Sequence, residues 1–329
     1  MRLPMNRRAF LAILGAAVGT PAAAAISSRK KPFRIGYLHP TDSHDVACTA
    51  FREALQHAGY VIGVNTILEE RFAEDDVARL PALAAELVAR HVDVIVAVSP
   101  TAIRAARAAT GTIPVVMAFS GDDPVKSGFA ATLARPGGNT TGLTTVALDM
   151  APKWIELLAD LRPGIRSIAV LRSPARADHD AQIAVMRVAA EAQRIRLHVA
   201  EVHGVEQYAS AFNALSTAGC EAIVVLSGPE FTHNRVRLVE LVNEHRLPSV
   251  YQFSDFVLIG GLASYGPGIA DLSARAVVYV DKILKGANPA LLPIEQPRRL
   301  FLVLNRKTAN ALGVAIPPRL LLQADEIIQ

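Results

Sequence analysis

The sequence predicts an α/β fold made of two doubly wound parallel-sheet lobes joined by a three-segment hinge. The first observation is that short apolar runs alternate with longer amphipathic stretches along most of the 329 residues, an order that covers both faces of a parallel sheet with helices. The second is that this pattern occurs twice along the chain. The third is a C-terminal part that fits neither copy alone, as expected for a chain that returns to the first lobe and then to the second.

An internal repeat divides the chain into two halves of similar plan. Each half contains three strand-like runs in the same order and at nearly the same spacing. Because each half then holds one supersecondary plan, we expect two lobes of the same type. The matched segments are residues 34–38 with 167–171, 94–100 with 222–227, and 114–120 with 248–254.

Individual elements follow from the spacing of apolar residues. The largely apolar run from 92 to 98 is typical of a strand buried on both faces of a parallel sheet. Residues 77–90 place Leu80, Leu83 and Leu87 on one face at helical spacing. Strands of the first kind and helices of the second therefore alternate, which predicts right-handed βαβ units in each half.

Three extended segments are predicted to cross between the lobes and form the hinge. Residues 140–145 follow a Pro-Gly-Gly-Asn turn cluster, and residues 258–265 precede a long helical pattern. A proline-rich passage at 289–297 then leads to a last strand at 300–304. We therefore assign residues 26–145 and 260–292 to lobe one, and residues 146–259 and 293–329 to lobe two. The predicted hinge residues are Thr144, Thr145 and Tyr265.

Residues 1–25 are predicted to be an export signal. Arg2, Arg7 and Arg8 form a basic start, an apolar stretch follows, and the alanines at 22–25 supply the small residues that a signal peptidase needs. The order Asn-Arg-Arg-Ala-Phe-Leu resembles a twin-arginine signal, and the general secretory route remains the alternative. Neither cysteine lies at the end of the apolar stretch, so we expect a soluble periplasmic protein without a lipid anchor.

The charge and the missing motifs exclude several classes of function. The net charge of +4 falls to about +1 without residues 1–25, which carry three arginines and no acidic residue, so no nucleic-acid surface is predicted. The G-x-S-x-G, G-x-x-x-x-G-K-[ST] and H-E-x-x-H motifs are absent from the sequence. The Gly-rich segment 137–142 precedes a strand and not a helix, so it is a turn. We expect a protein that is not an enzyme, with no catalytic residue and no cofactor.

Two other groups of residues have ordinary explanations. The segment 39–45 contains two histidines and two aspartates that could ligate a metal, but a strand-to-helix loop with a helix cap explains the same residues. No metal is therefore expected. Cys48 and Cys220 are predicted in different lobes, so we expect two buried free thiols, although a disulfide is chemically possible in an exported protein.

The candidate binding residues lie at or directly after the ends of the predicted strands. In open parallel sheets, ligands bind beyond the carboxyl ends of the strands, and two facing lobes bring these ends to one cleft. The set is rich in hydroxyl groups, with acidic, basic and aromatic side chains added, which is typical of a site for a small polar or amphipathic solute. The candidate ligand-binding residues are Tyr37, His39, Ser99, Thr101, Ser120, Asp122, Asp123, Arg172, Ser173, Ser227, Glu230 and Tyr251.

Many of these residues also have a structural interpretation. Ser99, Thr101 and Ser173 are of the type that caps helices. The two aspartates at 122–123 precede a proline and are typical of a turn, and Tyr251 could fill the core of lobe two. Both interpretations remain open at this point.

Five short segments carry a resemblance to a known family: residues 34–38 (RIGYL), 123–125 (DPV), 135–142 (RPGGNTTG), 260–267 (GGLASYGP) and 305–313 (NRKTANALG). Together they resemble the ABC-transporter substrate-binding proteins of the type I periplasmic-binding fold, in the branch that includes tryptophan- and phenylalanine-binding members. The resemblance covers essentially the whole chain after the predicted export signal.

The resemblance implies a periplasmic receptor, which we expect to be a monomer. It would deliver a small organic solute, such as an amino acid or an aromatic acid, to an ABC permease in the inner membrane with its cytoplasmic ATPase. Residues 227–231 depart from the Gly-Asp-Pro-like loop of many members, so the identity of the solute does not carry over, although Glu230 could replace the missing aspartate. A ligand-sensing domain that acts with a membrane signalling partner would share this fold, and an exported α/β enzyme is the remaining alternative.

Overall fold

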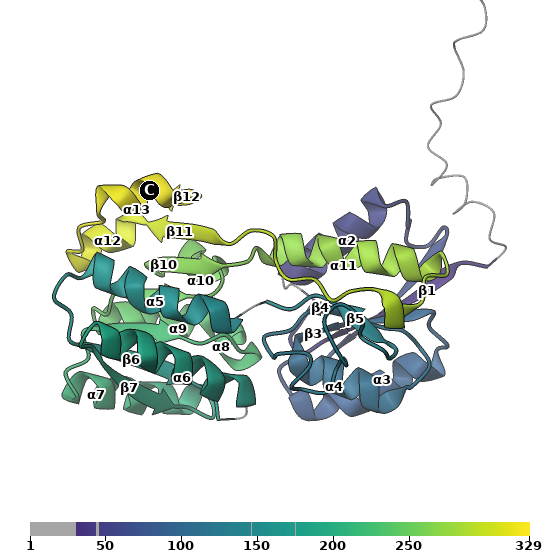
Figure 1. Ribbon diagram of the computed structural model, residues 1–329, viewed down its shortest axis with the longest axis horizontal. Coiled ribbons are helices and arrows are strands. Elements are labelled where there is room, and N and C mark those ends of the chain that lie inside the picture. Colours follow the sequence, from purple (N-terminus) through teal and green to yellow (C-terminus); the bar gives the residue numbers. More distant parts are fainter. Residues whose placement is uncertain (1–30, 44–45, 146, 175) are drawn as a thin grey trace, which may run out of the picture.

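The computed structural model describes residues 31–43, 46–145, 147–174 and 176–329. The predicted export signal, residues 1–25, lies outside the described residues. The described chain forms two α/β lobes side by side (Figure 1), each built on a sheet of predominantly parallel strands. The fold class predicted from the alternating pattern and the internal repeat is confirmed.

Among the described residues, lobe one contains a five-stranded parallel sheet in the order β2-β1-β3-β4-β5. Its strands are β1 (Phe33–His39), β2 (Thr66–Phe72), β3 (Val94–Val98), β4 (Val115–Phe119) and β5 (Thr140–Gly142). Helices α2 (Val46–His57) and α11 (Ile269–Leu284) cover one face, and α3 (Leu80–Ala89) and α4 (Ser99–Ala109) cover the other. Because β3 has a strand on each side and helices on each face, all of its residues are buried.

The described part of lobe two contains a seven-stranded sheet in the order β12-β11-β10-β9-β8-β6-β7, in which the β10–β11 pair is antiparallel. Its strands are β6 (Ser167–Arg172), β7 (Arg196–Glu201), β8 (Ala222–Val225), β9 (Ser249–Tyr251), β10 (Ala263–Gly266), β11 (Phe301–Asn305) and β12 (Glu326–Ile328). Its helices are α5 (Ala147–Leu161) and α6 (Ala177–Ala192) on one face, α7 (Tyr208–Thr217), α8 (Pro229–His233), α9 (Arg235–Glu244) and α10 (Asp255–Leu258) on the other, and α12 (Arg306–Leu312) and α13 (Pro318–Gln323) near the C-terminus. Short 3-10 turns occur at Val77–Arg79, Val205–Gln207 and Pro289–Leu291.

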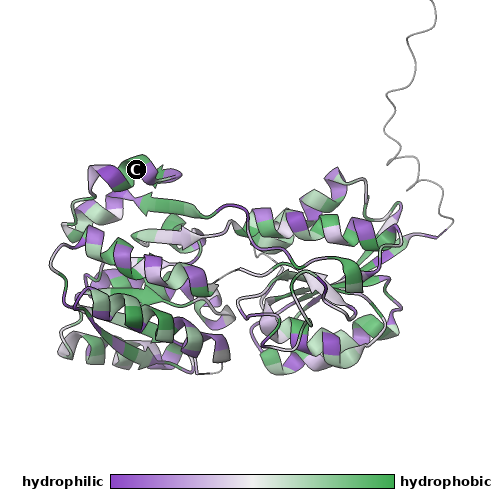
Figure 2. Ribbon diagram, in the orientation of Figure 1, coloured by the Kyte–Doolittle hydropathy of each residue, from purple (hydrophilic) through white to green (hydrophobic). Residues whose placement is uncertain are grey.

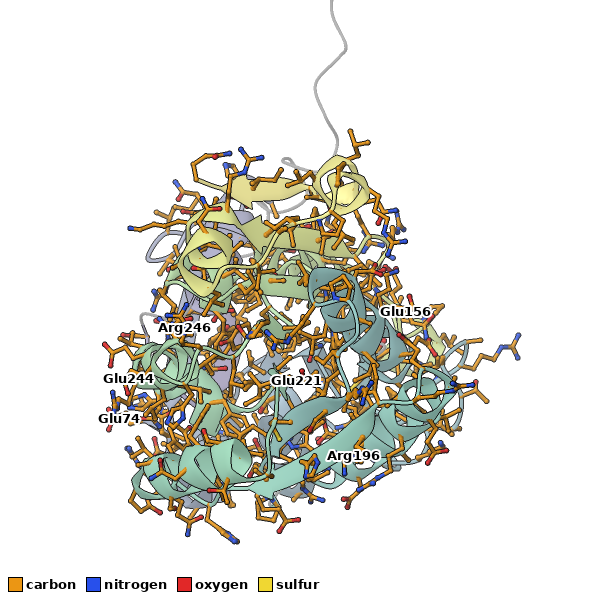
Figure 3. All side chains as sticks on the ribbon, turned by 90° about the vertical axis from the view of Figure 1, so that its left-hand side faces the viewer. Glu74, Glu156, Arg196, Glu221, Glu244 and Arg246 are labelled. Atoms are coloured by element: carbon orange, nitrogen blue, oxygen red, sulfur yellow. The ribbon has the colours of Figure 1, made fainter. Side chains whose placement is uncertain are left out.

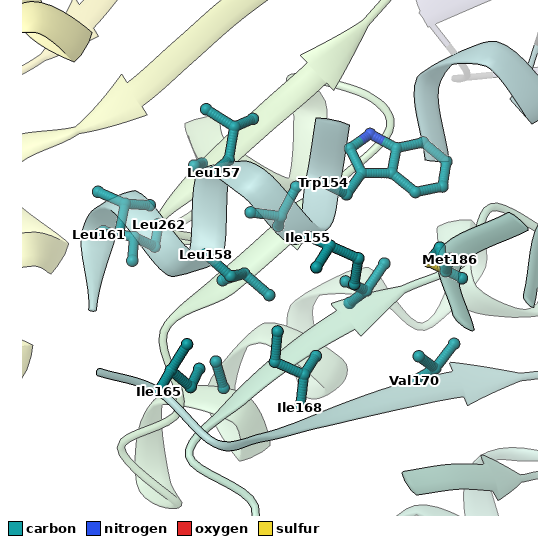
Figure 4. Close-up of a cluster of buried hydrophobic side chains, with 14 of the residues drawn as sticks. Trp154, Ile155, Leu157, Leu158, Leu161, Ile165, Ile168, Val170, Met186 and Leu262 are labelled. Carbon is teal, nitrogen blue, oxygen red and sulfur yellow. The ribbon is translucent and has the colours of Figure 1, made fainter. Parts of the chain in front are cut away.

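One core of lobe two surrounds Trp154 of α5 (Figure 4). The indole is 1% exposed and belongs to the same buried cluster as Ile155, Leu158 and Met186. Its Nε1 donates a hydrogen bond to the carbonyl of Tyr265 at 2.8 Å, which satisfies a buried donor and joins α5 to β10.

Hydropathy differs between the strands and the helices. In Figure 2 strands such as β6 and β11 are mostly hydrophobic, whereas hydrophobic and hydrophilic residues alternate along the helices. Figure 3 looks onto the end of lobe two, where charged side chains such as Arg196 and Glu244 lie at the rim. Among the described residues, no helix is both long and apolar enough to cross a membrane.

The first interlobe crossing lies between β5 and α5, where the sequence predicts it. Thr144 and Thr145 are buried there, and their N–H groups donate to the carbonyls of Glu295 and Ser120 at 3.0 and 2.8 Å. Both threonines are thus held against lobe one immediately before the chain enters lobe two.

The structure moves two of the predicted lobe boundaries. β10 pairs with β9 and β11 in the sheet of lobe two, so Tyr265 lies opposite Leu302 within that sheet and not at the hinge. Ile294 is buried in a core of lobe one, and Glu295 forms a bridge with Leu143 there. The returning segment of lobe one therefore begins after Gly266 and extends at least to Glu295, in place of the predicted 260–292. A short buried strand and an extended linker can have the same apolar, Gly-containing sequence pattern. The sequence alone therefore assigns residues 258–265 to a crossing between the lobes.

Candidate functional site

A pocket lies between the two lobes at the carboxyl ends of their strands. It has an empty volume of about 620 Å³, part of it open to solvent. This is where the parallel order of the strands predicts a ligand. We call it the interlobe pocket; its lining includes His39, Ser99 and Phe119 of lobe one and Arg176, Ser227 and Phe253 of lobe two.

Two phenylalanines from opposite lobes form an apolar wall of the interlobe pocket. Phe119 ends β4 and Phe253 follows β9, and their ring centroids lie 6.0 Å apart with an angle of 58° between the rings. Val98 and Ile269 extend the apolar lining on the side of lobe one. Such a wall suits an apolar, planar group, because aromatic rings favour tilted or offset contacts with one another.

A buried ion pair faces the same pocket from the start of α6. The Nε and Nη2 atoms of Arg176 donate to the two carboxylate oxygens of Asp178 at 2.9 and 2.8 Å, and both side chains are 7% exposed. Burial alone would lower the pKa of Arg176 and raise the pKa of Asp178. Each partner's charge outweighs this desolvation, so the pKa of Arg176 is raised, the pKa of Asp178 is lowered and both groups are charged.

His179 joins the loops that follow β6 and β8. Its Nδ1 accepts a hydrogen bond from the N–H of Ser173 at 3.1 Å, so the ring proton is on Nε2, which lies 3.0 Å from the carbonyl oxygen of Ser227. Desolvation lowers the pKa of His179, which favours this neutral form. Through these two hydrogen bonds the neutral imidazole holds the backbone of Ser227 in position beside the pocket.

The lobes approach each other closely at Gly121. A Cβ atom on this residue would lie 3.1 Å from Oδ2 of Asp178 and 3.3 Å from Nη2 of Arg176. Any larger side chain would push the ion pair of lobe two away from lobe one. The glycine therefore permits the observed contact between the lobes.

The amino-terminal end of α4 reaches the pocket from lobe one. Ser99 adopts a φ of 77°, a left-handed conformation that is uncommon for serine. Its hydroxyl lies 2.9 Å from that of Thr101. The helix dipole places positive partial charge at this end, and a strained residue beside it is a feature found at ligand-binding edges.

Four of the predicted residues line the interlobe pocket: His39, Ser99, Ser227 and the hinge residue Thr145. His39 is 2% exposed, and its Nδ1 is 2.9 Å from the hydroxyl of Thr41. That these residues contact a ligand remains a prediction.

Ser120, Asp122 and Asp123 lie outside the interlobe pocket and hold the loop after β4 in shape. The hydroxyl of Ser120 accepts from the N–H of Asp122 at 3.2 Å. Asp122 forms an ion pair with Arg104 at 2.7 Å, and Asp123 accepts from the N–H two residues on at 2.9 Å. These contacts match the turn interpretation of the sequence.

Arg172, Ser173 and the two tyrosines are also held away from the pocket. Arg172 pairs with Asp180 and Glu201 along the edge of the sheet, and Ser173 is 3% exposed beside His179. Tyr37 and Tyr251 are each 1% exposed in the cores, because a strand covered on both faces buries its side chains in either direction. Their rings stack on Phe51 at 4.9 Å and Phe256 at 4.7 Å, respectively.

Two predicted residues support the pocket from behind. Thr101 contacts Ser99 through its hydroxyl, as described above. Glu230, in α8, folds its carboxylate against the backbone of Gly228: a Cβ on that glycine would lie 2.7 Å from Oε1 of Glu230. Neither residue is part of the lining.

Four residues line the pocket without being among the candidate ligand-binding residues that the sequence predicts: Phe119, Phe253, Arg176 and Asp178. The two phenylalanines occupy equivalent positions in the repeat that matches residues 114–120 with 248–254. This equivalence is the signal that could have identified them, since matching positions of the two halves meet at the cleft. Arg176 immediately precedes α6 and Asp178 lies in its first turn, further along the chain than the residues that directly follow β6.

A side-chain contact joins the two lobes beside the pocket. Nδ1 of His233, in α8 of lobe two, lies 2.5 Å from Oδ2 of Asp75, which follows β2 in lobe one. Asp75 has a φ of 66°, and its N–H donates to the carbonyl of Pro40, itself a lining residue, at 2.9 Å. The pair exists only while the lobes are in contact.

The Asp75→Asn variant is expected to open more readily than the wild type. A partly exposed pair contributes about 0.2–1 kcal/mol, which corresponds to a roughly 1.5- to 5-fold larger open fraction, and asparagine tolerates the left-handed backbone. Small-angle scattering of the unliganded protein should show a larger radius of gyration. The control variant Glu240→Gln removes a charge from the Arg237 pair inside α9 and should leave the scattering profile unchanged. Equal profiles for the wild type, Asp75→Asn and Glu240→Gln would contradict a role of the His233–Asp75 contact in holding the lobes together.

Neither metal ligation nor disulfide formation is seen in the described residues. No group of three or more His, Cys, Asp or Glu side chains among them could hold a metal ion. Cys48 and Cys220 are both buried, in different lobes, and form no disulfide with each other.

Comparison with known families agrees with this geometry. Residues 38–328 match the family described as ABC transporter substrate binding protein. The chain belongs to this family. The protein is therefore the substrate-binding component of an ABC transporter, and family membership makes it a binding protein and not an enzyme.

Similar proteins come from several bacteria. The chain is 25% identical over 291 residues to the tyrosine-binding protein of Clostridioides difficile (strain R20291). The aligned residues cover 88% of this chain and 82% of that protein. A crystal structure of an ABC domain from Streptococcus pneumonia in complex with L-Trp has a TM-score of 0.84 and 26% identity, covering 91% of this chain and 100% of that one. A conserved domain protein from Vibrio cholerae has a TM-score of 0.83 and 24% identity, covering 90% and 100%.

Proposed function

We propose that this substrate-binding protein is the periplasmic receptor of an ABC importer and binds an aromatic organic solute in the interlobe pocket. The solute would be an aromatic amino acid or a related aromatic acid. The observation that carries the proposal is the Phe119–Phe253 pair, which brings rings from opposite lobes to 6.0 Å. An aromatic group held against both rings would contact the two lobes at once, so binding would favour the closed arrangement.

The polar part of the lining supports the same class of solute. Ser99, Thr145 and Ser227 bring hydroxyl groups to the pocket, and Arg176 brings a buried cation. A carboxylate is the group that an arginine and a helix amino terminus bind best. The tyrosine-binding protein and the L-Trp complex among the similar proteins support an aromatic ligand as well.

Delivery of the solute is part of the proposal. The predicted export signal at residues 1–25 would bring the protein to the periplasm. There it would pass its solute to a permease in the inner membrane, with transport driven by the cytoplasmic ATPase of the same system. Opening of the hinge would release the solute.

A screen of solutes tests the proposed ligand class. Thermal unfolding should be measured with L-tryptophan, L-tyrosine, L-phenylalanine and aromatic acids such as 3-phenylpropionate, and with aliphatic amino acids and sugars for comparison. At least one aromatic compound is expected to raise the melting temperature, because ligand binding stabilises the folded state. Stabilisation by an aliphatic solute or a sugar alone would overturn the proposal.

The Phe119→Ala and Phe253→Ala variants are expected to bind the aromatic solute about 10- to 100-fold more weakly. Loss of one buried aromatic contact removes roughly 1.5–3 kcal/mol of apolar burial. Isothermal titration with the best solute of the screen measures the change. Leu291→Ala, at a side chain that is 66% exposed and outside the pocket, should bind like the wild type, and unchanged affinity in both phenylalanine variants would show that the ring pair holds no ligand.

A further inference from the structure

We infer that the interlobe pocket selects an aromatic carboxylate that lacks an ammonium group, and not the zwitterionic amino acid. This inference rests on the proposed function and narrows its ligand class. It follows from how Arg176 and Asp178 use their hydrogen-bonding atoms. It also follows from the positions of the other carboxylates near the pocket.

Asp178 already accepts three hydrogen bonds from protein side chains. Its Oδ1 accepts from Nε of Arg176 at 2.9 Å, and its Oδ2 accepts from Nη2 of Arg176 at 2.8 Å and from Nε2 of Gln182 at 3.2 Å. The bidentate geometry makes Asp178 the counter-ion that orients the guanidinium. A ligand ammonium would have to compete with Arg176 for these oxygens.

Arg176 retains a donor that the protein does not use. Its side chain is 7% exposed and lines the pocket, yet its Nη1 has no hydrogen-bond partner among the described residues, whereas Nε and Nη2 are bound to Asp178. When a ligand enters the pocket and displaces its water, this N–H group requires an acceptor on the ligand. A ligand carboxylate in the pocket is an acceptor of the correct charge.

The facing side of the pocket is suited to the same group. The 11-residue helix α4 presents its amino-terminal end there, with Ser99 in the lining. The dipole of a helix favours an anion at this end. The unpaired Nη1 of Arg176 and the end of α4 thus approach one pocket from opposite lobes, and a carboxylate between them would join the lobes.

The other carboxylates near Arg176 are outside the lining. Asp122 is bound by Arg104 at 2.7 Å and by the hydroxyl of Ser127 at 3.3 Å. Glu230 folds against Gly228, and its charge acts on Arg176 and His179 as well as on Tyr208. Its Oε1 is buried and has no hydrogen-bond partner among the described residues. Because neither Asp122 nor Glu230 is part of the lining, Asp178 is the carboxylate that an ammonium group in the interlobe pocket would meet first.

A pair of ligands that differ only in the ammonium group tests the inference. Isothermal titration should compare 3-phenylpropionate with L-phenylalanine, and indole-3-propionate with L-tryptophan. The acid of each pair is expected to bind about 10- to 100-fold more tightly, because Asp178, the carboxylate in the lining, is already bound to Arg176 and the desolvated ammonium would have to compete for it. If the amino acids bind at least as tightly as the acids, the inference fails while the proposed aromatic ligand stands. If no aromatic compound binds, the proposed function itself fails.

Variants identify the residue responsible. Arg176→Lys keeps the positive charge but loses the planar fork, and should weaken binding of the acid more than 10-fold. The double variant Arg176→Gln, Asp178→Asn leaves no buried charge unpaired and should fold while losing the preference for the acid. Arg172→Gln, at an arginine outside the pocket, should bind like the wild type. Glu230→Gln should leave the preference unchanged; loss of amino-acid binding in that variant would show that Glu230 holds an ammonium and would overturn the inference.

Discussion

The Trp154→Ala variant is expected to lose about 3–5 kcal/mol of the free energy of unfolding. The indole is 1% exposed in the core of lobe two, and its Nε1 donates to the carbonyl of Tyr265 at 2.8 Å. The substitution therefore leaves a cavity and removes the donor to a buried carbonyl. The variant lacks the single tryptophan of the chain, so tryptophan fluorescence cannot report its unfolding. Chemical denaturation followed by circular dichroism measures the difference in the free energy of unfolding.

Two further variants separate the causes of this loss. Trp154→Phe keeps most of the ring and removes only the donor, so a smaller loss of about 1–3 kcal/mol is expected. Leu322→Ala, at a side chain that is 88% exposed, should change the free energy of unfolding by no more than about 0.5 kcal/mol. A Trp154→Ala variant as stable as Leu322→Ala would contradict the described core.

The Gly142→Ala variant is expected to lose about 3 kcal/mol or more, or to fail to fold. Gly142 ends β5 opposite Met117 with a φ of 130°, and an added Cβ would lie 2.2 Å from the carbonyl oxygen of Met117. An L-residue rarely adopts this backbone conformation, and the clash is with backbone that cannot rotate away. The edge of the sheet would have to separate from β4 just before the first crossing between the lobes. Thermal unfolding measures the loss.

Gly138 provides a matched control in the turn that precedes β5. A Cβ atom there meets no atom within 4 Å, and its φ is outside the left-handed region. Gly138→Ala should therefore unfold within about 0.5 kcal/mol of the wild type. Equal stability of the two alanine variants would argue against the close pairing of β4 and β5.

Apolar periodicity and the internal repeat predict most of the fold. The run that became β3 and the helical face of Leu80, Leu83 and Leu87 are both found where the sequence places them. The second crossing is misplaced, because β10 is as apolar and Gly-containing as a linker. What distinguishes it is its pairing with β11, which follows almost forty residues later in the chain, and no local pattern contains that information.

The binding site is predicted less well than the fold, for a geometric reason. The rule that ligands lie beyond the carboxyl ends of strands finds the correct edge of each sheet, and it finds His39, Ser99 and Ser227. It does not say which way a side chain points, so it also predicts Arg172 and Tyr251, which ion pairs and core packing hold away from the pocket. It also stops before Arg176, whose position depends on a bidentate contact with Asp178.

The return of α11 to lobe one has a consequence for the order in which the protein is completed during synthesis. Tyr279 and Val280 of this helix are buried against residues from the start of lobe one, including Phe51 and Tyr60, and the hydroxyl of Tyr60 donates to Asp281 at 2.9 Å. The ribosome makes all of β1 to β10 before this helix appears. A nascent chain therefore carries an uncovered apolar face on its first lobe while most of the second is already made. Folding of lobe one requires α11, and folding of lobe two requires β10, β11 and β12. Both lobes can therefore complete their folding only after the C-terminal part of the chain has been synthesised.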